Sequence, residues 1–163
     1  MFDMLVKLYD LPPLEPALNQ QKETGISVRR PLASEKQIVL DWVSKTFYPE
    51  WVNECDVAFA YQPVACFIAV EGNQLAGFAC YDVASRNIFG PTGVSQAYRG
   101  RGLGKALLLA CLHAMAAQGY AYGIIGGVGP AEFYAKVVGA VPIEGSTPGI
   151  YRGWLAGDEN TDD

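Results

Sequence analysis

The 163-residue chain has little charge and little of the basic character that a nucleic-acid partner requires. Only 18% of its residues are charged, and 12 Lys and Arg stand against 17 Asp and Glu, for a formal net charge of -5 at pH 7. This balance predicts no nucleic-acid partner and suits a soluble protein that binds cationic groups. Because 50% of the residues are hydrophobic, wholesale disorder is excluded and one domain with a sizeable core is expected.

Metal motifs and membrane segments are also missing. No CxxC pair and no common zinc spacing occurs among the four cysteines, so we predict no metal site and buried free thiols in a reducing compartment: Cys55, Cys66, Cys80 and Cys111. The N-terminus has no basic start followed by an apolar segment. No apolar stretch approaches the roughly 20 residues of a membrane helix without a Gly or a charge. We therefore expect a cytoplasmic protein without a membrane partner.

Hydrophobic patterning divides the chain into an N-terminal extension (1–25), one domain (26–156) and an acidic, frayed tail (157–163). In the extension, Met4–Tyr9 predicts a short strand. Apolar runs predict the domain's strands over residues 26–30, 64–70, 75–81, 88–94, 120–125, 141–143 and 149–155. Helical spacing predicts helices from Ser34 to before Pro49 and over residues 51–59, 102–118 and 130–138. This order predicts a mixed α/β layout around one sheet.

Two local signals refine the predicted sheet. The turn residues Glu71-Gly72-Asn73 separate two strand-like runs and predict a hairpin. Gly90-Pro91 interrupts the run over residues 88–94, which predicts a bulge or an edge because proline cannot donate to a strand ladder.

The segment from Val94 to Leu108 follows a strand and opens a helix. Glycines at its turn let several backbone N–H groups converge ahead of the helix, and three cations lie among them; these residues are Arg99, Gly100, Arg101, Gly102, Gly104 and Lys105. The arrangement predicts a site for two neighbouring phosphates. An ordinary glycine-rich turn with solvated basic residues is the structural alternative.

Two common phosphate motifs fail here. A P-loop requires Ser or Thr after Gly104-Lys105, where Ala106 stands, and a dinucleotide fingerprint requires Gly or Ala at Leu107. The pattern [QR]-x-x-G-x-[GA] is matched fully by residues 99–104. It resembles the pyrophosphate loop of the GCN5-related N-acetyltransferase (GNAT) superfamily, and the resemblance spans roughly residues 26–155.

This resemblance implies an α/β (α+β) fold with a mixed, mostly antiparallel sheet of about six to seven strands and about four helices. It implies acetyl-CoA as acyl donor and no metal. The pantetheine arm would contact Thr92, Gly93 and Val94, and a backbone N–H near Val94 would polarise the thioester carbonyl. The pyrophosphate would bind Arg99, Gly100, Arg101, Gly102, Leu103, Gly104 and Lys105.

The family resemblance also implies a catalytic tyrosine. Tyr134 matches the family's general acid, which protonates the departing CoA thiolate; a packed aromatic residue is the alternative. Two departures leave the base unassigned, because Gly127 stands where many members have Asn and Tyr122 where some have Glu. A water chain, a residue from the N-terminal half or carbonyls of the glycine-rich run 126–130 could serve. His113 is interpreted as a rim residue.

On the acceptor side, the resemblance places Trp51, Glu54 and Tyr81 near the substrate, which we expect to be a small amine or an amino terminus. Core aromatics and surface acids are the alternative for each. Residues 1–25 could cap this pocket, complete a sheet edge or mediate a homodimer. Two other functions remain open: a non-catalytic acyl-CoA sensor, and a partner-binding domain that has lost CoA.

Overall fold

The computed structural model describes residues 1–155, so the predicted acidic tail lies outside the described residues. The strands are β1 (Met4–Lys7), β2 (Ile26–Arg29), β3 (Cys66–Glu71), β4 (Gln74–Tyr81), β5 (Ile88–Val94), β6 (Tyr122–Ile125) and β7 (Val141–Pro142). The α-helices are α1 (Glu15–Glu23), α2 (Lys36–Thr46), α3 (Pro49–Ala58), α4 (Leu103–Ala117) and α5 (Ala131–Val138).

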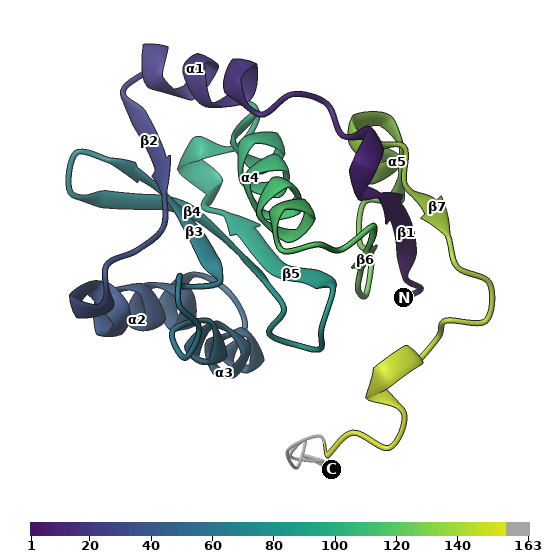
Figure 1. Cartoon of the computed structure of the whole chain (residues 1–163). Coiled ribbons are helices and arrows are strands. Elements are labelled where there is room, and N and C mark those ends of the chain that lie inside the picture. Colours follow the sequence, from purple (N-terminus) through teal and green to yellow (C-terminus); the bar gives the residue numbers. More distant parts are fainter. Residues whose placement is uncertain (156–163) are drawn as a thin grey trace.

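All seven strands join one sheet in the order β2-β3-β4-β5-β6-β1-β7 (Figure 1). The β5–β6 pair is parallel and the other pairs are antiparallel, which confirms the predicted mixed, mostly antiparallel sheet. The predicted hairpin is also confirmed, since β3 and β4 pair across Gly72 and Asn73.

Helices cover both faces of the sheet. On one face, Trp42, Phe47 and Trp51 from α2 and α3 pack their rings around Phe78 of β4. On the other, α4 packs on β3, β4 and β5, and α1 packs on β2 and α4. Successive β4 side chains point to opposite faces, and β4 is buried on both of them.

The N-terminal strand β1 lies inside the sheet rather than at an edge. It pairs with β6 on one side and with β7 on the other. Met4 lies opposite Ile125 of β6 and opposite Pro142 of β7. The expected short strand is therefore confirmed. Met4 and Val6 are buried, so β1 contributes to the core.

The strand predicted over residues 149–155 is wrong. The segment instead forms a 3-10 turn, η4 (Gly149–Tyr151), followed by a further turn. Gly149 and Gly153 have φ of +64° and +73°, left-handed values that a strand does not contain. The position between β6 and β7 is also occupied, because β1 fills it.

The four cysteines are buried and free, as predicted. The Sγ atoms of Cys55, Cys66 and Cys80 lie within 4.8 Å of one another, although the sequence spacing gave no sign of such a cluster. The contact with Cys55, and then burial, raises the pKa of the Cys66 thiol, and chiefly burial raises the pKa of the Cys80 thiol, so both stay neutral in the core. Among the helices of residues 1–155, none combines the length and apolar character of a membrane span.

Candidate functional site

The sheet opens between β5 and β6. On β4, the single residue Cys80 lies opposite Gly90 and Pro91 of β5, so the predicted bulge is confirmed. Parallel pairing with β6 ends at the same level, at Phe89 opposite Ile125. Beyond that point β5 has β4 as its strand partner on one side, which leaves its other edge free for a ligand backbone.

A cleft of about 450 Å³ lies beside this free edge. It is lined by the end of β5 and by the α2–α3 junction, namely Thr46, Phe47, Tyr48, Trp51, Thr92, Gly93, Val94 and Arg99. The structure therefore brings four of the predicted cofactor residues to the predicted acceptor residue Trp51. Thr46 and Phe47 were not singled out in the sequence, because Phe47 continues the apolar stripe of α2.

The glycine-rich loop connects β5 to α4. Gly100 and Gly102 both have φ of +78°, a left-handed conformation that L side chains rarely adopt. Gly102 is the N-cap of α4, and no side chain caps the first turn. The free N–H groups at the start of this 15-residue helix, together with the helix dipole, favour an anion.

The three cations of the loop are exposed and form no ion pair within residues 1–155. Arg99 Nε donates to the carbonyl oxygen of Val94 at 3.1 Å, which folds its guanidinium back toward the cleft. The Arg101 guanidinium lies 5.3 Å from the ring centre of Tyr98. With Lys105 on the first turn of α4, these charges flank the helix start and add to its positive potential.

A glutamine from the N-terminal extension supports the loop. Gln21 on α1 is 1% exposed, and its Nε2 donates to the carbonyl oxygen of Arg101 at 2.8 Å. Sequence reasoning missed this residue, because α1 reads as polar and the contact spans 80 positions. The available signal was the spacing, because Gln21 lies four residues after Ala17 and therefore on the same, buried face of α1.

Tyr134 lies where β5 and β6 separate. Its ring contacts Phe89, the last β5 residue paired with β6, and the neighbouring Phe133. Its side chain is 6% exposed, and burial raises its pKa to about 12. The phenol is therefore protonated across the neutral range. No hydrogen bond to its hydroxyl occurs within residues 1–155.

The two positions that depart from the family pattern have no catalytic base. Tyr122 is exposed and its ring packs edge-on against Tyr9. At Gly127, the backbone N–H donates to a carboxylate oxygen of Asp3 at 2.9 Å. The N-terminal segment thus reaches the turn after β6, where the missing asparagine would lie.

Of the other predicted acceptor residues, neither Glu54 nor Tyr81 lines the cleft. Glu54 lies one turn after Trp51 on α3 and accepts a 3.0 Å hydrogen bond from the hydroxyl of Tyr151. Burial raises the pKa of this carboxyl. Tyr81 is fully buried, and its hydroxyl accepts a hydrogen bond from Arg30 at 2.6 Å, whose guanidinium also lies over Phe67.

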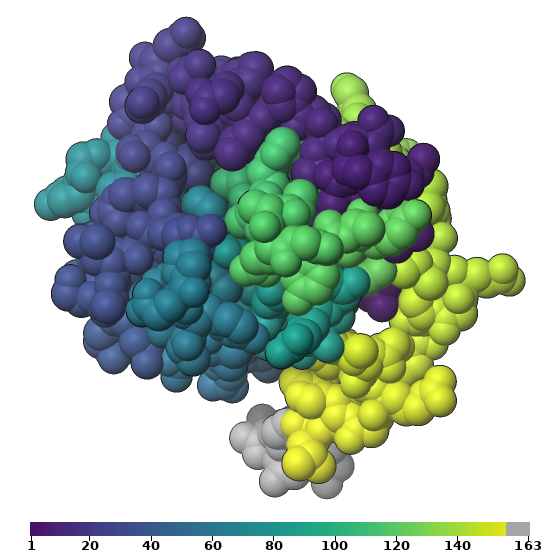
Figure 2. All heavy atoms as spheres, viewed as in Figure 1, coloured from purple at the N-terminus to yellow at the C-terminus, as the bar shows by residue number. Residues whose placement is uncertain are grey.

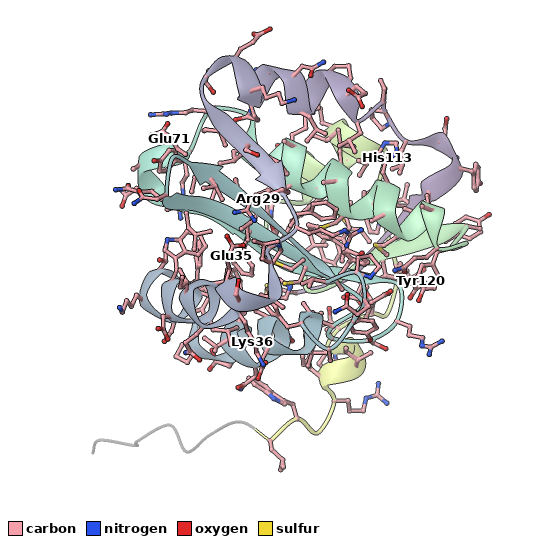
Figure 3. The ribbon with its side chains drawn as sticks, turned by 60° about the vertical axis from the view of Figure 1, so that its left-hand side comes forward. Arg29, Glu35, Lys36, Glu71, His113 and Tyr120 are labelled. Atoms are coloured by element: carbon pink, nitrogen blue, oxygen red, sulfur yellow. The ribbon has the colours of Figure 1, made fainter. Side chains whose placement is uncertain are left out.

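His113 lies on α4 (Figure 3), and it does not line the cleft. Its Nε2 is 2.7 Å from the carbonyl oxygen of Pro12, so it joins α4 to the N-terminal segment.

A strand bulge, a parallel pair that opens and a glycine-rich turn at the start of the next helix are the features that the resemblance to the GNAT superfamily led us to expect. The model of the acetyltransferase (GNAT) family matches residues 36–139, and the chain belongs to this family. Members of the family transfer acyl groups from acetyl-CoA. The chain has no significant sequence match among curated proteins.

Solved structures with the same fold are distant in sequence. One is the GCN5-related glucosamine N-acetyltransferase region of a fungal multi-domain GH3 β-N-acetylglucosaminidase, with TM-score 0.72 and 14% identity over 87% of this chain. Another is a GCN5-related N-acetyltransferase from Sphaerobacter thermophilus, with TM-score 0.61 and 18% identity over 87% of this chain. This chain spans 19% of the first protein and 48% of the second.

Proposed function

We propose that this chain transfers an acetyl group from acetyl-CoA to an amine acceptor, a small molecule or an amino terminus, by direct attack on the thioester. One observation carries the proposal. The cleft joins the free edge of β5 and Arg99, which suit the donor, to the aromatic residues Phe47 and Trp51, which suit an acceptor. A donor and an acceptor held in one cleft react as if in the same molecule.

The donor side consists of the loop and the β5 edge. The N–H groups and cations of residues 100–105 suit the pyrophosphate of acetyl-CoA. From there the pantetheine arm can run along the free edge of β5 past Thr92 and Gly93. A backbone N–H near Val94 would then stabilise the oxyanion that forms as the amine adds to the thioester carbon.

Tyr134 completes the proposed chemistry. When the tetrahedral intermediate collapses, the C–S bond breaks and CoA leaves as a thiolate. A protonated phenol at the opening of the sheet can donate to that sulfur. Because a pKa of about 12 makes the phenol a weak acid, a strong hydrogen bond that stabilises the thiolate fits better than complete proton transfer.

The proposed acceptor is cationic before it reacts. The rings of Tyr48 and Trp51 lie 5.1 Å apart at the cleft and offer faces to an ammonium group. Glu54, one helical turn beyond, supplies a negative charge near the same surface. Its raised pKa makes it a better proton acceptor than an ordinary carboxylate. Tyr81 has no role in the proposed acceptor site, because its hydroxyl is hydrogen-bonded to Arg30 away from the cleft.

A non-catalytic acyl-CoA sensor is the second candidate. The observation that favours it is that neither Gly127 nor Tyr122 supplies a base side chain. At Gly127 the backbone N–H donates a hydrogen bond to Asp3 instead. A sensor and an enzyme would share the loop and the cleft, and they differ in turnover.

Two measurements test the proposal together. Acetyl-CoA added in thermal-shift experiments should raise the melting temperature, because a ligand of the folded state stabilises it by roughly 3 kcal/mol at a hundredfold excess over Kd. A panel of amines and amino-terminal peptides is then assayed for thiol release. Binding without release for any amine favours the sensor, and absence of a shift at millimolar acetyl-CoA refutes both.

A further inference from the structure

The N-terminal extension contacts the proposed pyrophosphate loop. Helix α1 lies against α4, and the space-filling view shows the purple N-terminal segment directly on the green of α4 (Figure 2). Gln21 is the polar residue of α1 that reaches the loop, through its 2.8 Å hydrogen bond to Arg101. At 1% exposure it is shielded from solvent, so water cannot replace this hydrogen bond without rearrangement.

The orientation of the Gln21 amide follows from its partner. A carbonyl oxygen accepts hydrogen bonds, so the NH2 group rather than the amide oxygen must face Arg101. The Oε1 atom, left on the other side, is the one buried side-chain polar atom of residues 1–155 that has no partner. An unpaired buried acceptor loses its hydrogen bonds to water without replacement, which destabilises the folded state. Gln21 is therefore a poor choice for stability alone.

The same hydrogen bond fixes the direction of the next backbone N–H. In a planar trans peptide the C=O and N–H point in opposite directions. The Arg101 carbonyl points toward α1, so the N–H of Gly102 points away from α1. That N–H belongs to the N-cap residue of α4, whose first turn has no side-chain cap.

Without Gln21 this peptide can rotate. A flipped peptide would turn the Arg101 carbonyl oxygen toward the anion site and would replace an attractive dipole with a repulsive one. Gln21 packs directly against this peptide, since a Cβ at position 102 would lie 3.5 Å from Gln21 Nε2, an ordinary van der Waals contact.

We infer that Gln21 is a positioning residue for pyrophosphate binding: from the N-terminal extension it holds the Arg101–Gly102 peptide so that the Gly102 N–H faces the phosphates of acyl-CoA. This inference rests on the proposed function, because both require that the loop binds acyl-CoA. It adds the extension of residues 1–25 to the cofactor site, although Gln21 itself does not contact the ligand.

The test uses Gln21→Met in the full chain. Methionine matches the length of glutamine and removes both the donor and the unpaired acceptor. We expect the Kd for CoA, measured by calorimetry, to rise roughly tenfold, as for one lost charge-assisted contact. We expect the melting temperature without ligand to stay equal or to rise. Binding of pantetheine, which lacks the pyrophosphate, should not change.

Gln118→Met is the matched control, because Gln118 is exposed at the opposite end of α4. It should leave the Kd for CoA unchanged. Gln21→Leu makes the same test should the methionine variant not fold.

The outcomes separate the two proposals. Wild-type protein that binds neither CoA nor acetyl-CoA overturns the proposed function and this inference with it. Wild-type protein that binds CoA, with a Gln21→Met variant that binds it equally well, overturns this inference alone. A variant that loses stability and weakens CoA and pantetheine alike shows a merely structural glutamine and also overturns it.

Discussion

Single residues at the opening of the sheet have environments that fit donor chemistry. Tyr134 is buried against Phe89, and Gly93 lies so close to Phe47 that no side chain fits between them. In both cases the surroundings of the residue decide its role: burial sets the protonation of Tyr134, and the Phe47 ring requires a residue without a side chain at position 93. Each can be tested by a change of one or a few atoms.

Replacing Tyr134 by Phe removes the phenol oxygen and keeps the ring contacts with Phe89 and Phe133. We expect turnover with an active amine to fall by roughly 100-fold, the usual contribution of one positioned acid. The Kd for acetyl-CoA should stay within about twofold, since the hydroxyl acts on the leaving sulfur. Steady-state kinetics and calorimetry measure the two quantities. Equal turnover in the variant would remove Tyr134 from the mechanism.

Replacing Gly93 by Ala should narrow the cleft. A Cβ there would lie 2.6 Å from two atoms of the Phe47 ring, which is packed among Trp42, Trp51 and Phe78. We expect a loss of about 1–3 kcal/mol in unfolding free energy and weaker acetyl-CoA binding. Urea denaturation measures the first effect.

The control for this prediction is a double-mutant cycle. Phe47→Leu makes room for the added methyl group, so the double variant should be less destabilised than the sum of the two single variants. Additive effects would show that the clash is relieved elsewhere.

At the scale of elements, β5, the loop and α4 act as one unit. The bulge at Gly90-Pro91 interrupts the β4–β5 pairing just after the last paired residue of β5 and β6, the loop turns the chain, and α4 begins with uncapped N–H groups. The two left-handed glycines, Gly100 and Gly102, allow this turn. The conformation of the loop is therefore the property most sensitive to substitution.

Gly102→Ala and Gly104→Ala should have different effects. Alanine at position 102 must adopt φ near +78°, which costs about 1–2 kcal/mol and tends to move the N-cap out of place. Gly104 is already helical and its added Cβ would meet nothing closer than 4.0 Å, so alanine should stabilise α4 by up to about 1 kcal/mol. Thermal denaturation and CoA calorimetry compare the two. Equal CoA affinity in both variants would contradict this account of the loop.

The start of α2 gives a pH-dependent prediction. Glu35 accepts two hydrogen bonds from Arg29, at 2.8 and 2.9 Å, and one from the Leu32 N–H, at 2.7 Å (Figure 3). Chiefly because of Arg29, the pKa of this carboxyl falls from 4.5 to about 2. A lowered folded-state pKa stabilises the protein above pH 4.5, and that contribution is lost as the pH falls toward 2.

The expected size of this effect is about 1 kcal/mol, since the Arg29 side chain is 40% exposed and solvent screens the pair. Glu35→Gln should therefore be less stable than wild type by about this amount at pH 7, and the difference should shrink between pH 4.5 and pH 3. Urea denaturation at each pH measures it. A difference that does not depend on pH would show that the ion pair is not its source.

Most elements were predicted from the sequence because their signals are local. The bounds of β5 match the prediction over 88–94, and the bulge follows from Gly90-Pro91. Face assignment failed where patterning is uninformative: β4 is buried on both faces, so nothing in the sequence separated Tyr81, held by Arg30, from residues near the cleft.

Long-range contacts explain what the sequence did not reveal. Gln21 meets Arg101 across 80 positions, and β1 enters the sheet beside β6 from the opposite end of the chain. The incorrect strand over 149–155 has a local cause instead, because Gly149 and Gly153 adopt left-handed φ values that a strand does not contain. Periodicity reports which residues are buried, whereas it does not report their partners.

For the whole molecule, the N-terminal segment holds the C-terminal half of the sheet together. β7 has β1 as its sheet neighbour, and β6 is paired with β1 on one side and β5 on the other. Asp3 further binds the turn at Gly127, and its own N–H donates to Ser146 at 2.8 Å. The two ends of the described chain therefore depend on each other for their structure.

Deleting residues 1–10 should consequently remove more than one strand. It leaves β7 without a partner and exposes the edge of β6, so we expect loss of cooperative unfolding and of CoA binding together. Point variants calibrate the effect: Val6→Ala, at a fully buried site, should lose roughly 2 kcal/mol, and Lys7→Ala, at an exposed one, less than about 0.5 kcal/mol. Calorimetric melting measures all three proteins. A truncated chain that melts cooperatively and still binds CoA would show that the chain from residue 11 onward folds without β1 and that β1 is only an addition to a complete domain.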